Sequence, residues 1–175
     1  MCKLYVNATF GLYADVRYNS HGSTESLVGM FDSLDVDTDS DGLPLLPDFQ
    51  IVTRICVLGS EENQENLLNR GAKLVFKIRL TKCDKDLDKQ LGKDLSTFIL
   101  DLGDPAVKDS ICKACFDYLN FTQVTRVASL VLEPGVGKYV VKLLIAEADD
   151  SHELADDDFT VQSMYPLTVG MRKKV

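Results

Sequence analysis

The sequence predicts an all-β protein, namely an antiparallel immunoglobulin-like β-sandwich of about eight strands with one or two short helical insertions. Several segments alternate between apolar and polar residues, which is the pattern of a strand with one buried face. These segments do not alternate regularly with helices, and this argues against a parallel sheet. With 175 residues, 45% of them apolar, the chain can bury a core of its own, so we expect a single domain over residues 1–175.

The amino-terminal segment shows the clearest alternation. Every even position from 4 to 16 is apolar, whereas most odd positions are polar or glycine. Residues 19–23 are typical of a turn, and residues 26–31 are largely apolar again. We therefore predict a β-hairpin over residues 4–31.

Two further strands are predicted in the middle of the chain, at residues 49–57 and 73–83. The second of them points Leu74, Phe76, Ile78 and Leu80 inward, and it points Lys73, Lys77, Arg79 and Thr81 outward. This one-faced pattern indicates an antiparallel sheet with one side in water.

The second half of the chain adds more strands and one of two predicted helices. Strands are expected at residues 98–102, 125–132, 139–146 and 159–169, the last of them broken near Pro166. Helices are expected at residues 60–70 and 104–119, because each segment begins with residues that favour a helix start and the second repeats apolar residues at helical spacing.

Three short motifs suggest a family. They are FGLYAD at residues 10–15 followed by SLVGMFDSL at 26–34, LLPDFQIVTR at 45–54, and LVLEPG at 130–135. Together they resemble an uncharacterised prokaryotic and phage family of small immunoglobulin-like β-sandwich proteins, whose members combine an early (I/V)GxFD strand end with a late EPGxY strand start. The resemblance implies the same sandwich, and the family has no assigned activity or site that could be transferred.

The last of these motifs also has a direct physical interpretation. Pro134 and Gly135 form a typical turn pair. Tyr139 follows at the start of a strand, where a tyrosine can hydrogen-bond across the corner of a sandwich. This arrangement supports the predicted fold class.

The charge of the chain is unevenly distributed. The formal charge of −8 results from 19 Lys and Arg against 27 Asp and Glu. Residues 31–50 contain six acids and residues 147–158 contain seven, and neither segment contains a base. The remaining chain has more bases than acids, which argues against a uniformly acidic DNA mimic.

The first acidic segment contains the sharpest candidate site. Asp37, Asp39 and Asp41 occupy positions one, three and five of a potential Ca²⁺ loop, with Gly42 at position six and Asp48 at position twelve. The shorter Asp at position twelve, two prolines and the flanking strands differ from an EF-hand. The alternative interpretation is a solvated Asp-rich turn, since Asp and Gly both favour turns.

Other candidate groups favour structural roles. Cys112 and Cys115 have redox or zinc spacing, but the further ligands or the βαβ setting that such sites need are not evident, so we expect buried thiols. The two histidines are His21 and His152, in a predicted turn and an acidic loop. We therefore expect no enzymatic activity and no resident cofactor.

A basic segment covers residues 70–93, with eight bases and three acids. Such a stripe can meet phosphates or an acidic partner. No outward aromatic residues accompany it, as binding of single strands would require, so we expect no nucleic-acid partner. The alternative is a polar sheet face, or an edge strand protected by charge.

Taken together, these features predict a non-enzymatic binding or assembly module with a protein partner. Two alternatives stay open: a phage-type inhibitor that inserts an acidic loop into a cationic groove of a host protein, and a metal-dependent hydrolase built on the acidic loop. The five cysteines and the absence of an apolar run of eighteen residues lead us to expect a cytoplasmic protein with no membrane association.

Overall fold

The computed structural model describes residues 5–18, 24–58, 69–83, 92–107, 119–133, 135–148 and 154–172. Within this part of the chain there are helical residues at positions 69 and 105–107, together with eleven strands and one short 3-10 helix. They are β1 (Tyr5–Tyr18), β2 (Thr24–Met30), β3 (Ser33–Thr38), β4 (Pro44–Leu46), β5 (Phe49–Leu58), β6 (Lys73–Lys82), β7 (Lys93–Asp101), β8 (Leu119–Val127), β9 (Leu130–Val131), β10 (Gly137–Ala148), η2 (Asp156–Asp158) and β11 (Thr160–Met171).

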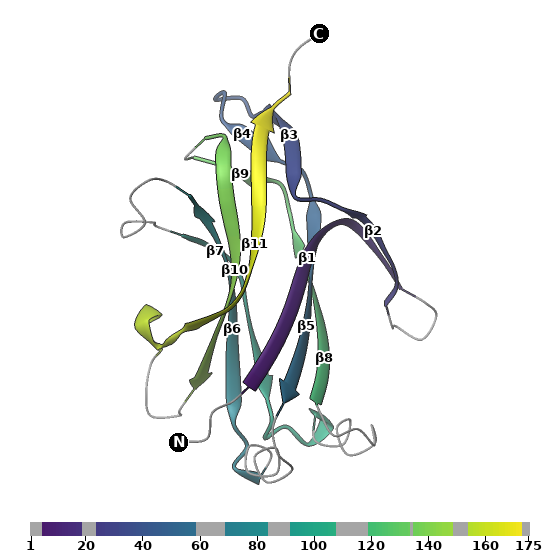
Figure 1. Cartoon of the computed structure of the whole chain (residues 1–175), viewed down its shortest axis with the longest axis vertical. Helices are drawn as coiled ribbons and strands as arrows, with labels where there is room; N and C mark the ends of the chain where they lie inside the picture. Colours follow the sequence, from purple (N-terminus) through teal and green to yellow (C-terminus); the bar gives the residue numbers. More distant parts are fainter. Residues whose placement is uncertain are drawn as a thin grey trace.

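The strands form two sheets. A four-stranded sheet has the order β2-β1-β5-β8, and a seven-stranded sheet has the order β7-β6-β10-β11-β3-β4-β9. All neighbours are antiparallel except β3 and β11, which pair in parallel. In Figure 1, β1, β5 and β8 run side by side, and β6 and β10 lie to their left. The predicted all-β class with two sheets is therefore confirmed.

One apolar core joins the inner faces of both sheets. Leu12 of β1 and Ile51 of β5 are fully buried and belong to the same cluster as Phe76 and Ile78 of β6 and Val141 of β10. The inward set predicted for residues 73–83 is correct, since Leu74, Phe76 and Ile78 are fully buried and Leu80 nearly so. The immunoglobulin-like strand order stays a prediction.

Tyr139 makes the predicted corner contact. Its hydroxyl donates a hydrogen bond to the carbonyl oxygen of Gly135. The Gly135 N–H in turn donates to the carbonyl oxygen of Leu132, 2.8 Å away. These two bonds fix the connection between β9 and β10, and Tyr139 is only 3% exposed.

Several element boundaries differ from the prediction. Residues 33–38, expected to belong to an acidic loop, form β3, because Leu34 and Val36 face the core while their acidic neighbours face outward. The strand expected at residues 125–132 is in fact the end of β8 and the separate β9, and β7 begins five residues earlier than residue 98.

Pro166 does not break the last strand, since β11 continues through it opposite Val140. Proline is tolerated there because β11 pairs with β3 only from Thr168 onward, so its other side carries no strand at residue 166. In the helix predicted over residues 104–119, residues 105–107 do form a helical turn. Leu119, by contrast, belongs to β8. Residues 59–68 and 108–118 lie outside the described residues.

Candidate binding surfaces

Residues 39–43 form a self-contained turn between β3 and β4. One carboxylate oxygen of Asp39 accepts hydrogen bonds from the N–H groups of Asp41, at 3.0 Å, and Leu43, at 2.8 Å. The backbone closes the same turn, since the Asp39 N–H donates to the Leu43 carbonyl oxygen over 2.8 Å. Gly42 adopts a φ of 80°, which favours glycine. Asp39 therefore acts as the turn-forming residue that the alternative interpretation expected.

The other carboxylates of the predicted Ca²⁺ loop lie apart from this turn or face solvent. Asp37 accepts a hydrogen bond from Arg172 Nη1 over 3.1 Å, and Asp41 is exposed. Within the described residues, no three side chains of His, Cys, Asp or Glu are grouped so that they could hold a metal ion. Calcium binding by Asp37, Asp39, Asp41 and Asp48 stays a prediction, which calorimetric titration of the wild type and of Asp39→Ala tests.

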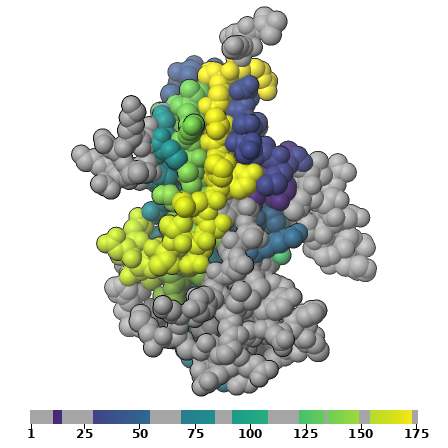
Figure 2. Space-filling model, viewed as in Figure 1, coloured from purple at the N-terminus to yellow at the C-terminus, as the bar shows by residue number. Residues whose placement is uncertain are grey.

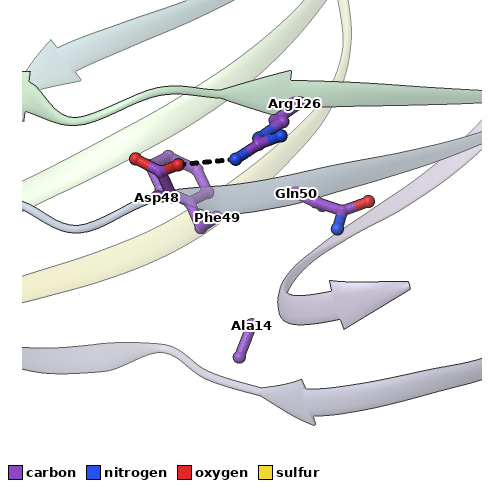
Figure 3. A pocket seen from close by; sticks show the side chains of 5 residues that line it. All are labelled: Ala14, Asp48, Phe49, Gln50 and Arg126. Carbon is purple, nitrogen blue, oxygen red and sulfur yellow. Dashed lines mark hydrogen bonds and ion pairs between the residues drawn. The ribbon is translucent and has the colours of Figure 1, made fainter. Parts of the chain in front are cut away.

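Asp48 belongs to a polar surface pocket of about 260 Å³ on the four-stranded sheet. Arg126 of β8 donates to one carboxylate oxygen over 2.9 Å. Ser129 donates to the other from both its N–H and its hydroxyl, at 2.9 and 3.0 Å. Figure 3 shows the pair of Asp48 and Arg126 beside Gln50, with Phe49 next to them. The hydrogen bond from Arg126 is the largest cause that lowers the pKa of Asp48.

The second acidic segment meets the basic segment on the outer face of the seven-stranded sheet. Arg79 of β6 donates to both carboxylate oxygens of Asp156, over 3.0 and 2.9 Å, and to Asp94 of β7. Lys77 lies 3.3 Å from Asp156 and 4.0 Å above the ring centroid of Phe159. Hydrogen bonds from Arg79 and Lys77 lower the pKa of Asp156 to about 2.

Because of this contact, the basic stripe on β6 is less exposed to solvent than the sequence predicted. We define residues 154–159 as the strap, which Figure 2 shows in yellow-green on the same side of the molecule as β11. The side chains of Lys77 and Arg79 are only 19% and 20% exposed, and Thr81, expected to face outward, is buried. Because these cations already pair with Asp94 and Asp156, little of their charge is open to phosphates or to an acidic partner.

The outermost strand β7 presents a different kind of surface. It pairs with β6 along its length and, within the described residues, with no other strand. Residues 95–100, LSTFIL, contain no charge. Ile99 is 62% exposed, whereas Phe98 points the other way and stacks on Phe76 with ring centroids 5.0 Å apart. Sequence reasoning missed this edge, although the uncharged run of strand-forming residues was visible.

The cysteines and histidines considered as candidate site residues are not among the described residues. Cys112, Cys115, His21 and His152 fall outside the described residues. Cys83 is a free and exposed thiol. No helix in the described part of the chain is long and apolar enough to cross a membrane.

Comparison with known proteins adds no relative to this picture. No family model, no curated protein and no solved structure matches the chain. The function proposed below therefore rests on these surfaces.

Proposed function

We propose that this chain is a non-enzymatic assembly module that joins a second copy of itself through the free edge of β7. The observation that carries the proposal is a strand edge with which no other described strand pairs and whose central residues are uncharged and partly apolar. Sheets normally protect such edges with lysine, proline or inward charges, because unpaired N–H and C=O groups invite another strand. Residues 96–100 contain none of these devices.

The sequence of β7 suits pairing with itself. In an antiparallel pair centred on Phe98, Thr97 of each copy lies opposite Ile99 of the other, on the outer face. Both residues are β-branched and exposed, and such cross-strand pairs stabilise a sheet. No charge is brought opposite a like charge between residues 96 and 100. The two seven-stranded sheets would then continue into one another across a two-fold axis.

The start of β7 limits the length of this interface. The register between β6 and β7 shifts between Ile78 and Arg79, which leaves Leu95 as an extra residue. Such a bulge twists an edge strand away from a partner. We therefore confine the pairing to residues 96–100, and an interface of this size belongs to the weak and concentration-dependent class.

The alternative function, an inhibitor that inserts an acidic loop into a cationic groove, has less support from the ion pairs of the acidic residues. Asp37, Asp48 and Asp156 each pair with a cation of the same chain. The two proposals differ in their response to salt, because self-association of a chain with a charge of −8 strengthens when repulsion is screened, whereas a complex between an acidic loop and a cationic groove weakens.

The test uses one charged substitution at the edge and a matched one away from it. Ile99→Lys places a charge on the exposed side of β7, and Met164→Lys places the same charge on β11, at an equally exposed position of 63%. Sedimentation velocity over a range of concentrations should show a reversible dimer for the wild type and for Met164→Lys, and a monomer for Ile99→Lys. A wild type that stays monomeric at millimolar concentration, or a dimer that Ile99→Lys leaves intact, would contradict the proposal.

A further inference from the structure

A pocket of about 400 Å³ lies between the end of β6, the start of β7 and the connection from β9 to β10. This volume falls within the range of small-molecule sites. It is separate from the outer side of β7 used in the proposed assembly, since it is lined by Leu80 and Tyr139, which belong to the core cluster.

The walls of the pocket are apolar and fixed in place. Leu80, Leu132 and Tyr139 are between 3% and 5% exposed. The Tyr139 hydroxyl is held by the Gly135 carbonyl oxygen. The Leu132 N–H donates to the Pro44 carbonyl oxygen over 2.9 Å. Because these groups are already ordered by the fold, a ligand would not have to order them on binding.

The rim of the pocket is charged, and cations outnumber acids. Lys82 and Lys93 line it together with Glu133. Lys82 also interacts within the protein. Lys93 and Glu133 are both exposed, and neither has an ion pair with another described residue. Lys93 is therefore a cation that a ligand can engage. Lys82, Lys93 and Glu133 together give the mouth of the pocket one positive charge in excess, which favours an anionic head group.

We propose that this pocket binds a small amphipathic anion, with a carboxylate at Lys93 and a short apolar body against Leu80, Leu132 and Tyr139. An apolar cavity with a small number of charged groups at its mouth fixes both the position and the orientation of such a ligand. A neutral molecule of the same shape lacks the contact with Lys93, and a cation is repelled by the two lysines. The inference does not depend on the assembly through β7.

The test is a calorimetric titration with decanoate, below the concentration at which it forms micelles. The wild type should bind one decanoate per chain and should not bind decyltrimethylammonium. Lys93→Gln should weaken decanoate binding about fivefold to tenfold, as expected for the loss of one charge-assisted contact. Lys142→Gln is the matched control, since Lys142 belongs to β10 but does not line the pocket, and its affinity should equal that of the wild type.

A second variant tests the location of the apolar body. Val131 lines the pocket at the edge strand β9 and is partly exposed, so Val131→Phe should occupy the cavity and abolish binding while the far-ultraviolet circular dichroism stays unchanged. Absence of binding to the wild type, equal binding of the cationic detergent, or equal affinities for Lys93→Gln and Lys142→Gln would each overturn the assignment.

Discussion

Tyr139 illustrates how a single side chain can fix a connection of the fold. Its ring contributes to the core, and its hydroxyl satisfies the carbonyl oxygen of Gly135 in the preceding turn. Removing the hydroxyl leaves that carbonyl without this partner but keeps the buried ring. The contribution of the hydrogen bond can therefore be measured separately from the contribution of packing.

We expect Tyr139→Phe to lower the free energy of unfolding by about 1 kcal/mol, as is typical for one hydrogen bond. Urea denaturation followed by circular dichroism measures this difference. Tyr13→Phe is the control, because Tyr13 makes no hydrogen bond with a described residue through its hydroxyl, although its ring is less buried than that of Tyr139. An equal effect of both substitutions would show that the Gly135 contact does not stabilise the turn.

Two threonines are buried on the inner face of the four-stranded sheet, and removing the hydroxyl of one of them should raise the free energy of unfolding instead of lowering it. The hydroxyls of Thr53 and Thr125 are buried and have no hydrogen-bond partner among the described residues. Burial of an unpaired hydroxyl is unfavourable, so Thr53→Val, which keeps the shape, should raise the free energy of unfolding by about 1 kcal/mol. Thr160→Val should not, since its hydroxyl donates to the Ile145 carbonyl oxygen over 3.3 Å. A loss of stability in Thr53→Val would mean that its hydroxyl is satisfied.

Whether the contact of a single side chain could be predicted from the sequence depends on how far along the chain its partner lies. The partner of Tyr139 lies four residues away, and the sequence predicted a hydrogen bond of this tyrosine at the corner, although it did not identify Gly135 as the acceptor. The role of Asp39 within its own turn was also one of the expected alternatives. Arg126 lies 78 residues from Asp48, and only the pairing of β5 with β8 brings the two together. No local pattern contains that information.

Among the elements, the strap has the clearest electrostatic signature. Lys77 and Arg79 of β6 bind Asp156 and lower its pKa from 3.8 to about 2. Because the folded pKa is the lower one, the ion pairs stabilise the fold fully above pH 3.8, where Asp156 is ionised in the unfolded chain as well. This stabilisation is lost as the pH falls from about 4 to about 2.

We therefore expect Asp156→Asn to change the acid unfolding of the protein. Between pH 4 and pH 2 the wild type should lose more stability than the variant, and the difference between them should shrink in high salt, because the group is exposed. Thermal unfolding at several pH values measures both effects. Asp157→Asn serves as the control, since Asp157 lies in the same turn and forms no ion pair with another described residue. Parallel pH profiles of all three proteins would contradict the role of the strap.

The sequence also explains which elements were predicted well. Strand β6 was recognised because its inner apolar residues alternate with outer residues of which three, Lys73, Lys77 and Arg79, are charged. Strand β3 was missed because the aspartates of its outward face were interpreted as loop residues, although Leu34 and Val36 alternate with them. β3 pairs with the nearby strand β4 through only two residue pairs, and its longer pairing is with the parallel strand β11, more than 120 residues away. Most of the pairing that makes it a strand was therefore not visible locally.

For the whole molecule, the apolar pattern was sufficient for the fold class but not for the topology. Alternation specifies which face of each strand is buried, and two such sheets must pack face to face to cover them. It does not specify the order of the strands within a sheet. The same limit applies to the surface, where the acidic and basic segments were recognised separately and their contact at Arg79 and Asp156 followed only from the fold.

Backbone hydrogen exchange tests directly whether β7 is the edge through which two copies of the chain join, when the same protein is compared at low and high concentration. We predict that the amides of residues 96–100 become more protected as the concentration rises, while those of the central strand β10 do not change. Exchange in β7 that is independent of concentration, or protection that appears instead on other strands, would contradict the claim.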